Sequence, residues 1–498
     1  TTNIMKTSAA KLIQVATRDF LDRQKIQRQT TSNQFFSDLN NKLTSPSDDE
    51  ILSAALTLGS VASLTANQQL IGAIDGIFVN ANSLLSHADD NIKLAAARAL
   101  MYLSYLPENR GSIGTVDGIV HNLNALLNHS NENLIHTAIS TLRFLACHPE
   151  NQQLIAETTE ALNNVNALLT HSSNHIKLEA VTTLRNVACR PKNLRLIVMV
   201  DDTPHNLNRL LTHPNDDITV QTTTTLRFLA CLPENQQIIG AVNGVFTNLN
   251  TLLTHPSNDI QLAAVRALGN LTCRNPENKQ RIGKINGIFH NLNSLLNHSP
   301  DTIKQHATKA LLNLTYIQEY RRPIGSVDGI FHNLNTLLTY SSDTIKLQTA
   351  SSLVHLGLDP ENQRLIGKVD HIFHNLNTLL IHSSDDIRFQ AFWALKLIII
   401  IPENKKKFQY LINAHKYGLC QQLQISEICY NPYTLELTQS LDLARDITES
   451  IVPENQIWII DWLQINIWSK EKDKRKIEIL EKLRKHLLSF VQPRLAWE

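Results

Sequence analysis

A 42-residue repeat runs through most of this sequence and constrains its fold more than any other feature. The lines IFHNLNSLLNHS, IFHNLNTLLTYS and IFHNLNTLLIHS begin at Ile288, Ile330 and Ile372. The asparagine before x-Leu-Leu recurs in steps of 42 residues, with one step of 43, at Asn82, Asn124, Asn166, Asn208, Asn250, Asn293, Asn335 and Asn377. A Pro-x-Asn triplet keeps the same register. So regular a period predicts a stacked array of small repeats and argues against a single central core.

Each repeat is predicted to contain three helices. A short first helix follows the proline, which suits a helix start. Glycines then end it, where Asp-Gly or Asn-Gly pairs favour a left-handed turn: Gly76, Gly118, Gly244, Gly287 and Gly329. The second helix carries IFHNLNxLL, and the third is the longest. The residues expected to cap the third helix at its N-terminus are Asp48, Asp90, Glu132, Asn174, Asp216, Asn258, Asp301, Asp343 and Asp385.

The stretch from Pro276 to Thr315, PENKQRIGKINGIFHNLNSLLNHSPDTIKQHATKALLNLT, resembles an armadillo repeat nearly position by position. The alanine that this family places in the third helix recurs at Ala54, Ala96, Ala138, Ala180, Ala264, Ala307 and Ala391, with Thr222 and Thr349 as exceptions. The resemblance covers residues 36–412. It implies an all-α fold, a right-handed superhelical armadillo solenoid of about nine to ten three-helix repeats with divergent helical caps.

The expected organisation is an N-terminal capping helix over residues 1–36, an armadillo array over 37–412 and a divergent C-terminal helical segment over 413–498. Caps are needed because an array exposes apolar faces at both ends. The C-terminal segment holds four of the five tryptophans, Trp458, Trp462, Trp468 and Trp497. This favours a packed cap there over a separate contact surface. Membrane contact by the basic residues of the N-terminal helix is a less favoured alternative.

The bulk composition excludes several classes of protein. A formal net charge of +1 gives no whole-molecule field for nucleic acid or an anionic membrane. No apolar run approaches the ~20 residues of a transmembrane helix, and residues 1–36 do not resemble a secretory signal. Four of the six cysteines, Cys147, Cys189, Cys231 and Cys273, lie 42 residues apart. Because stacked helices lie ~8–10 Å apart, beyond the ~7 Å that a disulfide spans, we expect reduced core thiols and a soluble, cytoplasmic protein.

Two columns of histidine raise the question of metal binding. The first follows the second helix at His87, His129, His171, His213, His255, His298 and His382, with Tyr340 in one repeat. A ladder of rings ~8–10 Å apart does not suit a chelate, whose ligands lie ~2.1 Å from one ion. We therefore favour histidines that bond the last carbonyls of the helix. The second column, at His121, His205, His290, His332 and His374, is expected to form hydrogen-bond ladders between repeats, with a pH-sensitive surface as the alternative.

In armadillo proteins the third helices line a concave groove, where a Trp and an Asn per repeat grip an extended peptide. Carried over by position, the Asn survives at Asn186, Asn270 and Asn313 and the Trp at Trp393, so the ladder is not continuous and an importin-like role is disfavoured. The exposed arc is basic instead. The predicted partner-binding residues are Arg98, Tyr102, Arg143, Phe144, Arg185, Asn186, Arg227, Phe228, Arg266, Asn270, Lys309, Asn313 and Trp393. The expected ligand is an acidic extended or helical segment with apolar anchors; the alternative for the arginines is an ordinary solvated face.

The sequence contains no phosphate loop, GxSxG elbow or HExxH motif. The predicted function is a non-enzymatic scaffold or adaptor that binds a partner protein in the groove, with no cofactor, metal or nucleic acid. An enzyme or membrane-trafficking factor, active in the C-terminal segment with the array as its targeting arm, is the alternative. Near-identical repeats and richness in Asn, Ile and Lys further suggest a bacterial effector acting in a host cytoplasm.

Overall fold

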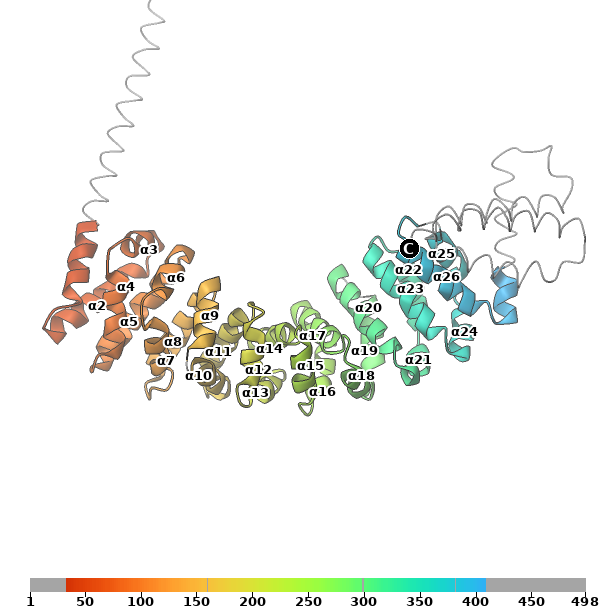
Figure 1. Ribbon diagram of the computed structural model, residues 1–498, viewed down its shortest axis with the longest axis horizontal. Helices are drawn as coiled ribbons and strands as arrows, with labels where there is room; N and C mark the ends of the chain where they lie inside the picture. The colour runs from red at the N-terminus through yellow and green to blue at the C-terminus, as the bar shows by residue number, and fades with distance from the viewer. Residues whose placement is uncertain (1–32, 159, 298–299, 381, 409–498) are drawn as a thin grey trace, which may run out of the picture. The chain divides into compact units, whose positions relative to one another are not determined.

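The computed structural model describes residues 33–408, apart from 159, 298–299 and 381. Over these residues the chain is helical and contains no strand (Figure 1). It divides into two compact units, Thr1–Ile288 and Phe289–Glu498, called here the first unit and the second unit. The tryptophan-rich C-terminal segment and nearly all of the predicted N-terminal cap lie outside the described residues.

In the first unit, the third helices pack against one another in chain order and form one layer. They are α2 (Asp48–Ala62), α5 (Asp90–Leu103), α8 (Glu132–Leu145), α11 (Asn174–Val187), α14 (Asp216–Leu229) and α17 (Asn258–Leu271). The first helices are α3 (Thr65–Gly72), α6 (Pro107–Gly114), α9 (Pro149–Glu157), α12 (Asn193–Met199), α15 (Pro233–Gly240) and α18 (Pro276–Gly283). The second helices are α4 (Ile77–Ser83) with η1 (Leu84–Ser86), α7 (Ile119–Leu126), α10 (Ala161–Ala167) with η2 (Leu168–Thr170), α13 (Thr203–Leu210) and α16 (Val245–Leu252).

The second unit repeats this order. It contains α19 (Ile288–Leu296), which begins at the boundary residue, α20 (Asp301–Thr315), α21 (Gln318–Gly325), α22 (Ile330–Leu338), α23 (Asp343–Leu356), α24 (Pro360–Ile366), α25 (Ile372–Leu379) and α26 (Asp385–Ile398). Its third helices, α20, α23 and α26, also pack in chain order. Residues 33–42 and 402–408, at the ends of the described chain, are helical as well.

The predicted glycine turns and alanine column are confirmed. Every glycine of the turn column has a left-handed backbone, with φ between 71° and 81°. In the repeats that lack this glycine, Glu160, Asp202 and His371 adopt the same conformation, with φ between 59° and 63°. The alanine column is buried, as are the two threonines that replace it. The repeat therefore fixes both the turn and the core position, even where the residue type changes.

The expected N-caps of the third helices were wrong by one residue. The caps lie one position earlier, and most are Ser, Asp or Asn: Ser47, Asp89, Asn131, Ser173, Asn215, Ser257, Pro300, Ser342 and Ser384. Asp89 and Asn131, for example, accept a hydrogen bond from the backbone N–H two residues on. The predicted column is instead the first residue of each helix, where a carboxylate also favours the positive end of the helix dipole.

The histidines that follow the second helix do not bond its last carbonyls, so that prediction was wrong. In six repeats the ring Nδ1 accepts a hydrogen bond from the backbone N–H two residues later, as His129 does from Asn131 at 3.0 Å. The Nε2 atom faces the first residue of the preceding repeat's third helix: 3.3 Å separates His129 from Asp90, and 3.2 Å separates His382 from Asp343. Tyr340, which replaces histidine once, donates to Asp301 in the same way. The rings of His87, His129, His171, His255 and His382 therefore join two consecutive repeats.

Asparagine, not histidine, forms the inter-repeat ladder of the second helices, so the expectation for the second histidine column was also wrong. The Nδ2 of Asn122 donates to the Oδ1 of Asn82, and the Nδ2 of Asn82 donates to the carbonyl of Asp117. The same two bonds recur along the chain, as in Asn375 to Asn335 and Asn335 to Asp370. The histidine column points outward: His121, His205, His290 and His332 are exposed and His374 is half-buried. The hydrogen bonds of the ladder satisfy side-chain amides whose burial would otherwise cost free energy.

The Asn of the Pro-x-Asn triplet joins consecutive first helices. In the first unit, the Nδ2 of Asn151 donates to the carbonyls of Arg110 and Leu145 at 2.8 and 3.1 Å. In the second unit, the Nδ2 of Asn362 donates to the carbonyls of Arg321 and Leu356 at the same two distances. This explains why the triplet keeps register with the rest of the repeat.

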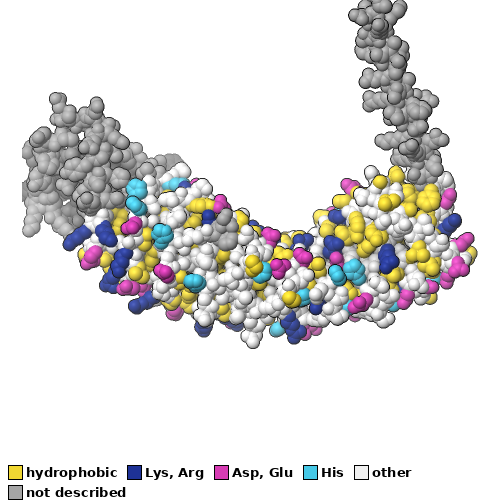
Figure 2. All heavy atoms as spheres, turned by 180° about the vertical axis from the view of Figure 1, so that it is seen from behind, with side chains coloured by type: hydrophobic (Ala, Val, Ile, Leu, Met, Phe, Trp, Pro, Cys, Tyr) yellow, Lys and Arg dark blue, Asp and Glu magenta, His cyan; other side chains and the backbone are white. Residues whose placement is uncertain are grey.

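The N-terminal end of the first unit exposes apolar side chains. Figure 2 shows hydrophobic residues gathered over its N-terminal helices, and Phe35, Leu56, Leu64 and Val79 are exposed there. An uncovered end of this kind is what creates the need for a cap. The capping role of residues 1–36 remains a prediction.

Candidate partner-binding face

The candidate site is best described relative to one buried leucine in each third helix from α5 onward: Leu100, Leu142, Leu184, Leu226, Leu268, Leu311, Leu353 and Leu395. Residues one, two and five positions after it form a surface along the third helices. In the first unit we call this surface the arginine face: Met101, Tyr102, Tyr105, Arg143, Phe144, Cys147, Arg185, Asn186, Cys189, Arg227, Phe228, Cys231, Gly269, Asn270 and Cys273. In the second unit we call it the apolar face: Leu312, Asn313, Tyr316, Val354, His355, Leu358, Lys396, Leu397 and Ile400.

The structure divides the predicted partner-binding residues between the two units. Ten of them belong to the first unit and three, Lys309, Asn313 and Trp393, to the second. Arg98 is exposed and Asn186 is buried, with 5% of its surface accessible, whereas the others are half-buried. Nine of the thirteen lie on the two faces. The other four lie two positions before the reference leucine, outside both faces: Arg98, Arg266, Lys309 and Trp393.

An aromatic cluster lies at the N-terminal end of the arginine face. The rings of Tyr102 and Tyr105 have centroids 5.6 Å apart, and those of Tyr105 and Phe144 are 4.5 Å apart. The guanidinium carbon of Arg143 lies 3.8 Å from the centroid of Phe144, within the range of a cation–π contact. Tyr105 is exposed. Packed aromatic and arginine side chains of this kind are frequent anchors in protein interfaces.

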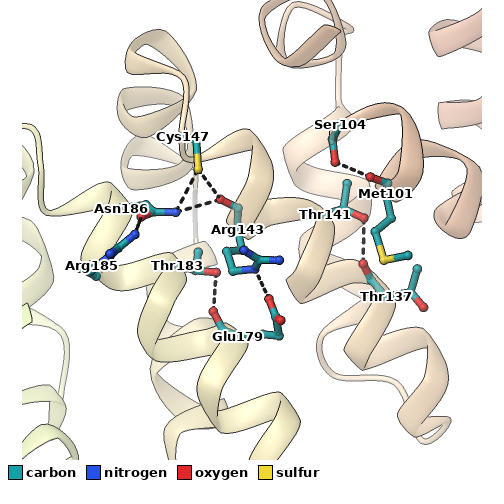
Figure 3. A network of polar contacts seen from close by, with 10 residues as sticks. All are labelled: Met101, Ser104, Thr137, Thr141, Arg143, Cys147, Glu179, Thr183, Arg185 and Asn186. Carbon is teal, nitrogen blue, oxygen red and sulfur yellow. Dashed lines mark hydrogen bonds and ion pairs between the residues drawn. The ribbon is translucent and has the colours of Figure 1, made fainter. Parts of the chain in front are cut away.

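The arginines of this face differ in their partners. Arg143 is paired with Glu179, as Figure 3 shows. No ion pair involves Arg185 or Arg227 among residues 33–408; Arg185 donates to the Oδ1 of Asn186 at 2.6 Å, and Arg227 lies 4.2 Å from the centroid of Phe228. Burial, and next the charge of Arg266, lower the pKa of Arg227. Neighbouring cations without a carboxylate partner can bind an anionic ligand.

Two of the three asparagines that the family resemblance assigned to peptide binding, Asn186 and Asn270, also bond within the array. The Nδ2 of Asn186 donates to the carbonyl of Arg143 at 3.0 Å and lies 3.3 Å from the Sγ of Cys147 (Figure 3). Asn270 makes the same two contacts, with Arg227 and Cys231. These amides therefore hold the last turn of the preceding third helix, and Asn186 presents little surface to a partner.

The prediction that the repeated cysteines lie in the core was wrong. They are free thiols, but Cys147, Cys189 and Cys231 are exposed and Cys273 is half-buried. They follow the end of the third helix, five residues after the reference leucine, where the chain turns away from the core. Tyr105, Tyr316, Leu358 and Ile400 occupy the same position. Sequence reasoning missed this column, although its two tyrosines were a signal of an exposed position.

The apolar face has a different character. Tyr316, Leu358 and Ile400 are 54%, 48% and 61% exposed. The ring of Tyr316 lies 4.3 Å from that of His355. The one lysine of this face, Lys396, lies 4.5 Å from the ring centroid of Trp393, and burial lowers its pKa. The surface therefore offers aromatic and aliphatic side chains with little charge.

The described residues contain no group of three or more His, Cys, Asp or Glu side chains able to hold a metal ion. None of the described helices is long and apolar enough to cross a membrane.

Comparisons with known proteins found a family match near the C-terminus and similar solved structures for the repeats. Residues 419–498 match the family described as the C-terminal domain of cyanobacterial DNA polymerase III delta prime. No curated protein matches the sequence. Among solved structures, an engineered protein is similar at 23% identity, with a TM-score of 0.65, over 79% of this chain and 95% of its own.

Two natural repeat proteins are similar in structure. One structure comes from work on a phosphorylation switch that controls the interaction between cadherin and β-catenin; it has 16% identity and a TM-score of 0.65, and the match covers 74% of this chain and 69% of that one. UNC-45 from Drosophila melanogaster has 17% identity and a TM-score of 0.57 over 74% of this chain. The match spans 52% of UNC-45. The chain has the fold of an armadillo-like helical repeat protein, an α-solenoid.

Proposed function

We propose that the chain is a non-enzymatic scaffold whose arginine face holds an acidic segment of a partner protein. The observation that carries this proposal is the pair Arg185 and Arg227, which lie on consecutive third helices and have no ion pair among residues 33–408. The aromatic cluster of Tyr102, Tyr105 and Phe144 lies on the same face and offers an apolar anchor. Charge-assisted hydrogen bonds to arginine give both affinity and orientation.

The spacing of the third helices limits which class of ligand can meet successive arginines. Packed helices lie ~8–10 Å apart, and a peptide in the extended polyproline II conformation advances ~3.1 Å per residue and returns to the same face every three residues. Carboxylates that meet successive arginines would therefore stand about three residues apart in such a peptide. An apolar residue in the same segment would fill the aromatic cluster. The ligand class is thus an extended segment with acidic residues at every third position.

The test uses fluorescence anisotropy with labelled peptides that contain Asp at every third position and one Phe. Arg185→Glu combined with Arg227→Glu should weaken binding by about 100-fold, because each substitution replaces an attraction by a repulsion. The matched control is Arg195→Glu with Arg209→Glu, which makes the same change of charge at exposed residues of α12 and α13. A scrambled peptide with clustered Asp should bind less tightly. Equal binding by both double variants would reject the arginine face as the site.

A second candidate concerns residues 419–498, which match the C-terminal domain of a polymerase subunit. In it, the C-terminal segment is a separate module that carries the activity, and the array brings a partner to it. A chain that ends at Ile412 distinguishes the two. If the scaffold proposal holds, this shortened chain keeps its full affinity for the peptide. If the activity resides in the C-terminal segment, the shortened chain loses that activity.

The location of the protein is a further hypothesis. Free, exposed thiols at Cys147, Cys189 and Cys231 support a reducing cytoplasm. An effector role in a host cell rests on composition alone, and a translocation assay with a reporter fused to the full chain tests it. Absence of the reporter from host cells would reject that role.

A further inference from the structure

The arginine face carries a row of accessible thiols that its scaffold function does not use. Cys147, Cys189 and Cys231 are exposed, free and equivalent in three consecutive repeats. Each lies 3.4 to 3.5 Å from the carbonyl of the arginine four residues earlier, to which its S–H group can donate. The row therefore consists of near-identical nucleophiles in one surface, and the groups around each sulfur decide how it reacts.

The three thiols differ in the residue that the following repeat places beside the sulfur. The Nδ2 of Asn186 lies 3.3 Å from the Sγ of Cys147, and the Nδ2 of Asn270 lies 3.3 Å from the Sγ of Cys231. Phe228 occupies the corresponding place beside Cys189 and offers no donor. A hydrogen bond to sulfur favours the thiolate. At Cys189, by contrast, burial around the sulfur raises the pKa, although the residue as a whole is exposed.

The charge around the row is positive. Arg227 interacts electrostatically with both Cys189 and Cys231, and Arg185 with Cys189. Nearby cations stabilise a thiolate and raise the local concentration of anionic reagents. A small molecule that carries carboxylates together with an electrophilic sulfur fits both features.

We propose that Cys147 and Cys231 are sites of reversible S-thiolation by an anionic low-molecular-weight disulfide of the glutathione type. The thiol loses its proton, and the thiolate attacks one sulfur of the disulfide. A protein–S–S bond forms as the small S–S bond breaks, and the leaving thiolate takes up a proton. One small disulfide is consumed and one small thiol released for each cysteine modified, and a second small thiol reverses the step.

Modification would also regulate the arginine face, a consequence that rests on the proposed function. The attached peptide would place its carboxylates beside Arg185 and Arg227 and occupy the position proposed for the acidic partner. Oxidising conditions would then release the partner without unfolding the array.

The experiment treats the folded full chain with glutathione disulfide and, separately, with neutral bis(2-hydroxyethyl) disulfide. Peptide mass spectrometry follows each cysteine. Because an amide hydrogen bond to sulfur favours the reactive thiolate at Cys147 and Cys231, and Cys189 lacks such a donor, the first two should react about threefold faster or more than Cys189. Glutathione disulfide should react faster than the neutral reagent, and its preference for Cys147 and Cys231 should be smaller, because Arg185 and Arg227 both interact with Cys189. Arg185→Gln with Arg227→Gln should reduce the advantage of the anionic reagent and leave the neutral reagent nearly unchanged.

The matched variants exchange the residue that lies beside each sulfur. Phe228→Asn should accelerate Cys189 and leave Cys147 unchanged, whereas Asn186→Phe should slow Cys147. Circular dichroism establishes that each variant is folded; if Asn186→Phe is not, the Phe228→Asn result still decides. Equal rates for the three cysteines, or a Cys189 that is unaffected by Phe228→Asn, would overturn the assignment. These rates do not depend on any partner, so failure of the scaffold proposal would leave them intact.

Discussion

The arginine face and the apolar face occupy equivalent positions in different repeats, yet their side chains differ in charge and polarity. Two residues after the reference leucine, Phe228 stands in the first unit and Leu397 in the second; five residues after it, Cys231 corresponds to Ile400. The contacts that stack the repeats hardly differ, since Asn151 and Asn362 make matching bonds. The stacking amides therefore lie in a column separate from most residues of the two faces, and those residues can change while the stacking amides stay the same. Asn186 and Asn270 are exceptions, because they belong to the arginine face and also bond to the preceding repeat.

The largest effect should come from removing the stacking amides. Asn151→Ala and Asn362→Ala each delete one buried and one part-buried hydrogen bond and leave carbonyls unsatisfied, at a cost of about 2–4 kcal/mol in the free energy of unfolding. We expect similar losses in the two units, measured by urea denaturation and by hydrogen exchange at the affected junction.

Asn163→Ala is the control, because Asn163 is exposed on α10. It should change stability by less than about 0.5 kcal/mol. A large difference between Asn151→Ala and Asn362→Ala would show that the two units are not stacked alike, and the comparison would fail.

The next effect concerns a gap in the arginine face. Gly269 stands where the preceding three repeats have arginine, and a Cβ at this glycine would meet nothing within 4 Å. Gly269→Arg should extend the row of cations and strengthen binding of the acidic peptide by about threefold or more, the effect of about one charge-assisted contact. Gly269→Ala adds the Cβ without the charge and should leave affinity unchanged. Equal affinities for the two variants would show that the charge of this column does not contribute to binding.

A smaller effect is expected on the apolar face. Leu358→Ser with Ile400→Ser removes two exposed side chains, so each change should alter stability by less than about 0.5 kcal/mol. Fluorescence of a dye that binds apolar surface should fall, while affinity for the acidic peptide stays the same. A loss of acidic-peptide binding would mean that this face also contacts the ligand, and the distinction between the faces would no longer hold.

The sequence predicted the contacts that the period itself determines. The buried alanines and the left-handed turns follow from position alone, and they hold even at Thr222 and Glu160, where the residue departs from the column. The roles of the histidines did not follow, because Asp90 and His129 meet only when consecutive repeats are stacked. Cys147 was misplaced because cysteine is usually a buried residue type, whereas its position lies past the end of α8.

The candidate site was predictable only in part. The arginines and aromatic residues follow from the angle that each residue makes on the third helix. Their partners do not, because Glu179, which pairs with Arg143, belongs to the next third helix. For the same reason, sequence alone did not show that Asn186 bonds within the array.

The smallest effect concerns a histidine that lacks the link shared by most repeats. His382 in the second unit faces Asp343, whereas the corresponding residue for His213 in the first unit is Asn174. Burial, and next the charge of Lys177, lower the pKa of His213 below its usual value near 6.5. The folded chain therefore favours the neutral ring, and its contribution to stability is intact above pH ~6.5 and is lost as the pH falls towards the lowered pKa.

Asn174→Asp supplies the missing carboxylate, and we expect it to raise the pKa of His213 and to reduce this loss of stability on acidification. NMR titration of the His213 ring measures the pKa, with His129 in the same chain as an internal control that should not change. An unaltered pKa for His213 would show that the carboxylate column does not govern these rings. In that case, the histidine links of the two units would depend on the backbone hydrogen bond to Nδ1 alone.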